Sequence, residues 1–164
     1  FNLYKKITVI KELLIMKKIL FSIILCLSFS VGAFAKDIII AETNTIDMLN
    51  KRDDGSIMVY SVDVAKVAVG ETVTWIPTDK MHNVEMRKGP DGAKLPKKSK
   101  FSKEFSMTFD VPGIYVYQCT PHVAMGMIGI IVVGGDVSNK EAISNTRMMG
   151  KAKKKLVKLL AAAN

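Results

Sequence analysis

The chain has 164 residues, with 24 Lys and Arg against 15 Asp and Glu, a formal net charge of +9 at pH 7. This length suits a single domain of ordinary size. The chain contains two Cys and two His, too few ligands for several metal centres.

The N-terminal part of the chain has the pattern of a secretory signal peptide. Met16 is followed by two lysines, an apolar run over residues 19–29 and an Ala-Phe-Ala sequence at residues 33–35. These match the charged region, hydrophobic region and cleavage site of such a signal. The apolar run is shorter than the ~20 residues of a membrane span. We therefore expect residues 1–15 to be upstream sequence from a wrong start, cleavage after Ala35, a periplasmic protein and no stable membrane insertion.

Residues 36–135 have the pattern of a β-sandwich. Short apolar or alternating runs separated by turn signals favour many short strands over helices or a parallel sheet. Trp75 is expected in the core, and residues 87–103 are expected to form a loop without regular structure. The expected strands lie within residues 38–41, 46–49, 58–64, 65–69, 72–76, 105–109, 114–118 and 128–133.

Residues 136–164 are expected to form a helical extension of the same domain. Residues 138–141 read Ser-Asn-Lys-Glu, the form of a capping box that opens a short helix. A second helix is expected over residues 147–162. A basic amphipathic helix can lie on a membrane, but packing on the sandwich is favoured. Its expected apolar face is Met149, Ala152, Leu156, Leu159 and Ala163.

The residues that carry chemistry are concentrated in C-T-P-H-V-A-M-G-M, residues 119–127. Cys119 offers a thiolate, His122 an imidazole and Met127 a thioether, on a short segment between two expected strands. One Cys, two His and a weakly bound Met is the ligand set of a blue-copper electron-transfer site. The second imidazole then has one source, His82, which is the other histidine of the chain.

Other uses of these residues fit less well. A c-type haem site needs Cys-x-x-Cys-His, and a structural zinc site usually needs four Cys or His ligands. A Cys-His hydrolase stays open, because a thiol nucleophile needs only a base and an orienting group. In that case nothing marks an oxyanion hole and Met127 has no role. The plainest alternative is a buried Cys, a surface His and core methionines.

The chain resembles the pseudoazurins, cupredoxins of the bacterial periplasm, over residues 37–163. The resemblance implies a mainly β, Greek-key β-sandwich of cupredoxin type with two C-terminal helices packed on it. It implies one copper ion bound by His82, Cys119, His122 and Met127, with Met127 the weak axial ligand. The stretches that carry it are Met48-Leu49-Asn50-Lys51, Gly70-Glu71-Thr72-Val73-Thr74-Trp75-Ile76-Pro77, Asp79-Lys80-Met81-His82-Asn83-Val84-Glu85 and the segment of residues 119–127.

The resemblance also implies roles for residues beside the ligands. Asn83 is expected to tie the two ligand loops together by hydrogen bonds, and Thr120 belongs to the same layer around the metal. Pro121 is expected to exclude water, and Met125 to pack beside the site, contacts that tune a metal centre. The chain departs from the common family pattern at Met81, often a small residue, and at Gln118, often a lysine.

As a function, the resemblance implies an electron carrier and not an enzyme. The expected protein is a monomeric shuttle that takes single electrons from a cytochrome-type donor and delivers them to a reductase such as copper nitrite reductase. A periplasmic copper-binding or copper-delivery protein is the alternative. A delivery protein needs an open site that releases copper, whereas a shuttle must retain copper through its redox cycles.

Positive charge is concentrated between residues 80 and 103, which hold eight basic residues against Glu85 and Asp91. Complementary charge raises the association rate without requiring a tight complex. We therefore expect Lys51, Lys80, Lys98 and Lys100 to dock an acidic patch on a redox protein. Nucleic acid is a poor alternative partner for an exported protein.

Overall fold

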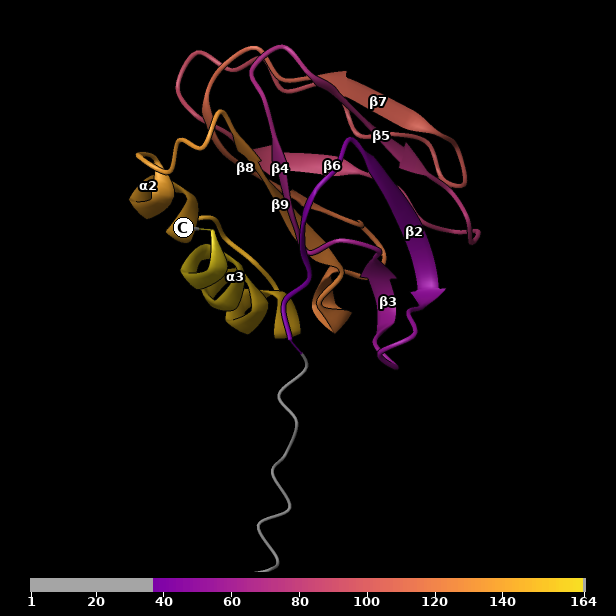
Figure 1. Ribbon diagram of the computed structural model, residues 1–164. Helices are drawn as coiled ribbons and strands as arrows, with labels where there is room; N and C mark the ends of the chain where they lie inside the picture. Colours follow the sequence, from indigo (N-terminus) through magenta and orange to yellow (C-terminus); the bar gives the residue numbers. More distant parts are fainter. Residues whose placement is uncertain (1–36, 164) are drawn as a thin grey trace, which may run out of the picture. The chain divides into compact units, whose positions relative to one another are not determined.

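The computed structural model describes residues 37–163, so the predicted signal peptide and the residues before it lie outside the described part. Two β-sheets face each other, and two helices at the C-terminus cover one of them (Figure 1). The expected β-sandwich with two C-terminal helices is therefore confirmed. The elements are β1 (Ile40–Glu42), β2 (Thr45–Lys51), β3 (Ile57–Tyr60), β4 (Val64–Val67), β5 (Thr72–Ile76), β6 (Glu85–Lys88), β7 (Phe105–Thr108), β8 (Gly113–Gln118), η1 (Val123–Met125), β9 (Ile128–Val133), α2 (Lys140–Ser144) and α3 (Lys151–Ala162).

The larger sheet has the strand order β1-β4-β9-β8-β6, and the smaller sheet has the order β3-β2-β5-β7. Every residue of β8 and β9 is buried. Their side chains alternate between two clusters, because successive residues of a strand point to opposite faces. Tyr117 and Ile131 enter the cluster between the sheets, whereas Val116 and Ile130 enter the cluster under the helices. This double burial explains the almost continuous apolar sequence of both strands.

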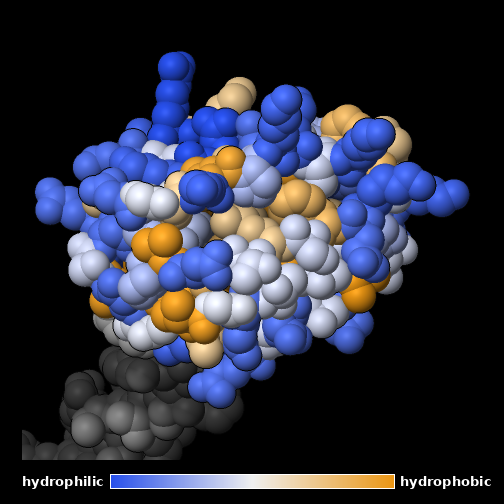
Figure 2. Space-filling view, turned by 90° about the horizontal axis from the view of Figure 1, so that it is seen from above, coloured by the Kyte–Doolittle hydropathy of each residue, from blue (hydrophilic) through white to orange (hydrophobic). Residues whose placement is uncertain are grey.

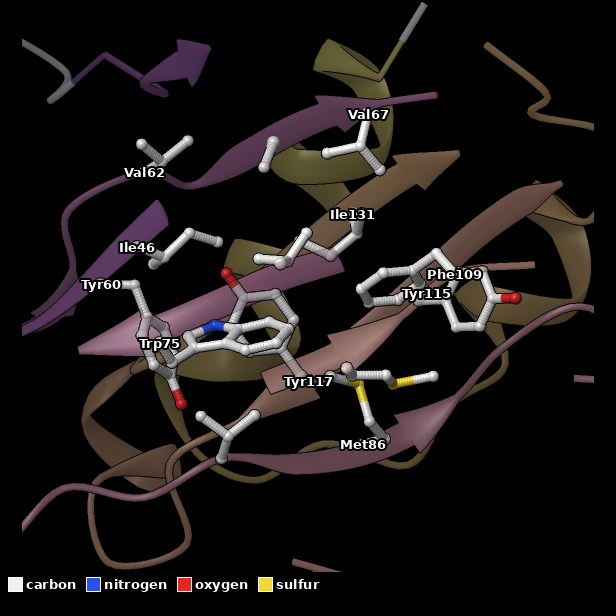
Figure 3. Packing of buried hydrophobic residues seen from close by; sticks show 14 of the residues in the cluster. Ile46, Tyr60, Val62, Val67, Trp75, Met86, Phe109, Tyr115, Tyr117 and Ile131 are labelled. Atoms are coloured by element: carbon white, nitrogen blue, oxygen red, sulfur yellow. The ribbon is translucent and has the colours of Figure 1, made fainter. Parts of the chain in front are cut away.

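The cluster between the sheets is built around Trp75, which is fully buried as expected. Its ring centroid lies 5.1 Å from that of Tyr117, and Tyr117 lies 4.8 Å from Tyr60 (Figure 3). Gly129 is paired with Tyr117 across the sheet, and a Cβ there would collide with the Tyr117 hydroxyl.

Seen from above, the end of the sandwich is mainly hydrophilic, with small separate hydrophobic areas (Figure 2).

Helix α3 packs along the outer face of the larger sheet, beside β9 and η1 (Figure 1). The preference for packing on the sandwich is confirmed, since Ala152, Leu156 and Leu159 are buried there. Met149 was wrongly placed on this face. It precedes the helix and is 63% exposed, because the helix begins only after Gly150, whose φ of 54° breaks the helical path. No helix within residues 37–163 is long and apolar enough to cross a bilayer.

Two further expectations were wrong in detail. Helix α2 has no capping box, since its N-cap is Asn139 and no side chain caps it. The Asn139 side chain instead accepts a hydrogen bond from Ile114 N and donates to Ile114 O, which ties α2 to β8. The expected loop over residues 87–103 begins inside β6, whose polar sequence concealed an edge strand paired with β8.

A buried carboxylate joins three distant parts of the chain. Asp63, with its side chain 2% exposed, lies between Arg52 and Lys155. The Arg52 Nη1 to Asp63 Oδ2 distance is 3.0 Å, and the Lys155 Nζ to Asp63 Oδ1 distance is 2.6 Å. Ile39 N also donates to this carboxylate. Asp63 therefore connects the β2–β3 turn, the segment before β1 and helix α3.

Replacing Asp63 by Asn is expected to lower the free energy of unfolding by about 3–5 kcal/mol, because two nearly buried cations lose their carboxylate. Urea unfolding followed by circular dichroism measures this loss. Asp53→Asn in the exposed β2–β3 turn is the matched control, expected to stay within ~0.5 kcal/mol of wild type. Equal losses in the two variants would contradict a special role for Asp63.

Candidate metal centre

Three donor atoms from two distant segments meet at one end of the sandwich. Cys119 Sγ lies 3.7 Å from His82 Nδ1 and 3.4 Å from His122 Nδ1. The two Nδ1 atoms are 3.1 Å apart. Among residues 37–163, these three form the one group of Cys, His and acidic side chains arranged to hold a metal ion.

The spacing of these atoms fits a shared metal ion. Bonds of about 2.0–2.1 Å to imidazole and about 2.3 Å to thiolate, at tetrahedral angles, place such donors roughly 3.3–3.6 Å apart. The observed separations of 3.1–3.7 Å lie close to this range. One thiolate with two imidazoles is a donor set suited to copper.

The β8–β9 hairpin positions Cys119 and His122. Gln118 at the end of β8 pairs with Ile128 at the start of β9, so the loop between them is closed at its base. Within the loop, Cys119 N donates to Met127 O at 3.0 Å, and Met127 N donates to His122 O at 3.2 Å. Gly126 turns the chain back after η1 with a φ of 102°, a conformation that glycine adopts without steric cost.

His82 comes from the segment that follows β5 and is fully buried. Its Nε2 lies 3.0 Å from Asn50 Oδ1, at the end of β2. An amide oxygen accepts a hydrogen bond from the Nε2–H group, so Nδ1 keeps the lone pair that faces Cys119 and His122. Sequence reasoning did not assign this role to Asn50, since its spacing from His82 in the chain carries no signal. Only the parallel pairing of β2 with β5 brings the two segments together.

Asn83 links the two ligand segments. Its Oδ1 accepts hydrogen bonds from Thr120 N at 2.8 Å and Thr120 Oγ1 at 2.7 Å. Its backbone oxygen accepts a hydrogen bond from the buried Tyr60 hydroxyl at 2.8 Å. These bonds hold the residue after His82 against the residue after Cys119.

Residues 99–102, in the lysine-rich part of the chain, are hydrogen-bonded to the other side of the His82 segment. Ser102 N donates to His82 O at 2.9 Å, and Ser102 Oγ accepts from Met81 N at 2.8 Å. Ser99 makes the same pair of bonds with Val84, at 2.8 Å and 2.9 Å. Residues 99–102 therefore support the His82 segment, a role that the sequence did not indicate.

Burial sets the protonation of the three donors before a metal binds. It lowers the pKa of His82, with the neighbouring His122 adding to the effect and Asp79 opposing it. Burial also lowers the pKa of His122 and raises the pKa of the Cys119 thiol. At pH 7 the imidazoles are therefore neutral and ready to bind, whereas the thiol keeps its proton until a metal ion displaces it.

The remaining residues expected at the site lie in the same loop. Met127 is fully buried and belongs to the same apolar cluster as Cys119. Pro121 is exposed, and Met125 is 43% exposed at the surface of the loop. The thioether of Met127 thus faces the interior of the protein and that of Met125 faces largely outward.

Comparison with known proteins agrees with this geometry. A family model described as copper binding proteins of the plastocyanin/azurin family matches residues 46–134. The pseudoazurin of Paracoccus pantotrophus is 36% identical over 126 residues, which are 76% of this chain and 86% of that protein. The chain belongs to the pseudoazurin family of cupredoxins.

Solved pseudoazurin structures have the same fold. The native protein of Hyphomicrobium denitrificans superposes with a TM-score of 0.67 at 39% identity, covering 74% of this chain and 98% of that one. The protein of Methylobacterium extorquens AM1 gives 0.67 at 34% identity, covering 78% and 100%. As a pseudoazurin, the protein takes one copper ion as cofactor and is a copper electron-transfer protein, in a family of electron carriers and not of enzymes.

Replacing Asn50 by Ala is expected to reduce copper affinity about 10–100-fold, because His82 loses the partner that orients its ring. Competition with a chelator of known affinity measures the change. Asn44→Ala, an exposed position before β2, is the control and should retain wild-type affinity. Wild-type affinity in Asn50→Ala would show that the other contacts of His82 orient its ring without Asn50.

Proposed function

We propose that the protein is a periplasmic electron carrier that cycles one copper ion between Cu(I) and Cu(II), bound by His82, Cys119, His122 and Met127. The observation that carries the proposal is the group of three donor atoms 3.1–3.7 Å apart. The proposed export rests on the signal-peptide pattern that ends at Ala35.

Bound copper supplies one-electron chemistry, and the protein keeps its ligands in one arrangement. Thiolate and thioether suit Cu(I), and imidazole suits both oxidation states. His82 is held by Asn50 on one side and Ser102 on the other, while Cys119 is fixed at the closed base of the hairpin. A frame that does not move between oxidation states keeps the rearrangement on electron transfer small.

His122 is the proposed exit for the electron. His82 and Cys119 are fully buried, whereas His122 is partly exposed. The surrounding loops present apolar side chains to solvent, namely Met81 at 62% exposure and Phe101 at 48%. An apolar contact zone around the exposed imidazole allows a partner to approach the copper closely and to exclude water.

The proposed docking lysines are neighbours in the chain of residues that belong to the His82 segment or are bonded to it. Lys51 follows Asn50, which bonds to His82, and Lys80 precedes Met81 in the His82 segment. Lys98 and Lys100 flank Ser99, which is bonded to Val84. All four lysines are exposed. Each lysine is thus next in the chain either to a residue of the His82 segment or to a residue hydrogen-bonded to that segment.

The proposed partners are redox proteins with acidic docking patches. A cytochrome-type donor would supply electrons, and copper nitrite reductase or a similar acceptor would receive them, with the carrier acting as a monomer. A copper-delivery protein is the alternative. The two buried ligands and their hydrogen-bonded frame favour retention of the ion over its release.

Replacing Cys119 by Ser is expected to abolish the intense blue absorption of the Cu(II) protein, because no other thiolate exists among residues 37–163. Visible spectroscopy measures the band, and circular dichroism checks the fold. Met127→Gln and Met125→Gln are a matched pair, of which only the first is expected to shift the reduction potential. Blue colour retained by Cys119→Ser would refute the site.

Reversing Lys80 and Lys98 to Glu is expected to slow electron transfer to an acidic partner at low salt. Reversing Lys140 and Lys153, which line a surface hollow that contains no residue of the metal centre, makes the same charge change and serves as control. Stopped-flow kinetics should show the difference between the pairs shrink as salt rises, since the screening length is ~8–10 Å near physiological ionic strength. Equal slowing by both pairs of substitutions would show that the docking face is not formed by Lys80 and Lys98.

A further inference from the structure

Helices α2 and α3 enclose a hollow on the surface that has no part in copper binding. Its volume is about 1030 Å³, and none of its lining residues belongs to the metal centre. Binding sites for small molecules usually have volumes of about 300–1,000 Å³ and mainly apolar walls. The hollow therefore has the size of a ligand site.

The walls combine apolar side chains with cations. Met148, Leu156, Val157 and Leu160 supply the apolar part. Val157 is 68% exposed, the largest exposed fraction among the exposed large apolar residues of the described chain. Met148, Leu156 and Leu160 are only 9%, 3% and 5% exposed, so they form the apolar floor of the hollow, and Val157 is its main exposed apolar side chain.

The cations lie around this wall. Lys140, Arg147 and Lys153 line the hollow, and Glu141 is the one acidic residue among the lining residues. No acidic side chain is paired with Arg147 or Lys153 within residues 37–163. Three cations against one carboxylate give the lining residues of the hollow an excess of positive charge.

The two kinds of side chain are arranged in order along α3. Lys153 and Val157 are four residues apart and so share one face of the helix, and Leu160 and Ala161 continue the stripe. The stripe from Lys153 to Ala161 is about 12 Å long. It is cationic at Lys153 and apolar from Val157 onward. A buried hydroxyl oxygen, Thr146 Oγ1, has no hydrogen-bond partner and also lines the hollow.

We propose that this hollow binds a single-chain amphipathic anion, such as a fatty acid. The carboxylate would lie at Arg147 and Lys153, within reach of a hydroxyl donor at Thr146, and the acyl chain would cover Val157 and Leu160. A soluble acidic peptide would neutralise the cations but would leave the apolar stripe exposed. The charge and the apolar wall together therefore fit an amphiphile better. The site is independent of the copper ion.

Isothermal titration calorimetry of the copper-loaded protein with dodecanoate, below its micelle concentration, tests the site. Binding of one dodecanoate per chain is expected. Arg147→Glu with Lys153→Glu should weaken it at least tenfold. Lys154→Glu with Lys158→Glu makes the same charge change on α3 outside this hollow and should retain the affinity within twofold.

Chain length provides the second measurement. Each methylene removed, from dodecanoate to decanoate and octanoate, should weaken binding about fourfold, which corresponds to ~0.8 kcal/mol per buried CH₂. Absence of dodecanoate binding would overturn the proposal. Equal weakening by both charge-reversal pairs, or an affinity independent of chain length, would also overturn it, because either result reduces the effect to attraction between charges.

Vesicles of phosphatidylglycerol distinguish the source of the ligand. Vesicle binding that free dodecanoate displaces would assign the hollow to membrane lipid, and dodecanoate binding without vesicle binding would assign it to free fatty acid. Vesicle binding by a protein that does not bind dodecanoate would reject the hollow as a site. Retention of the blue absorption and of the unfolding temperature in each variant shows that the fold is intact.

Discussion

The pairing of β8 with β9 is the interaction on which the metal centre depends. Six consecutive residue pairs join the two strands, from Gly113 with Val133 to Gln118 with Ile128. Because both strands are buried on both faces, a shift of register would move apolar side chains from one core to the other. The register therefore fixes where the loop begins and ends, and with it the positions of Cys119 and Met127.

The C-terminal helices help to fix the register of β8 and β9. They bury the outer face of the larger sheet, so that Val116 and Ile130 lie in an apolar cluster with Leu156 and Leu159. Asp63 adds a polar connection between α3 and the strands. The helices thus make the β8–β9 pair an internal element, whereas a sandwich without them would leave this face of the sheet in water.

The second half of the centre depends on contacts between segments far apart in the chain. His82 is fully buried, and it is oriented by Asn50 and supported by Ser102. Asn83 then binds Thr120 and joins the His82 segment to the cysteine loop. Hydrogen bonds therefore join the two ligand segments into one unit, and the loop that carries the lysines is bonded to the same unit.

The sequence alone determined the strands with strong period-two patterns and the burial of Trp75, because these follow from local periodicity. It also predicted the candidate metal site of Cys119, His122 and His82, because Cys and His are scarce in the chain. Only the tertiary structure decided the role of Asn50, the pairing of the polar strand β6, and the use of Asn139 to bind β8 instead of capping α2. Polar side chains at these places bind whichever groups the fold brings within reach. Their partners are set by contacts between distant segments, which leave no periodic pattern in the chain.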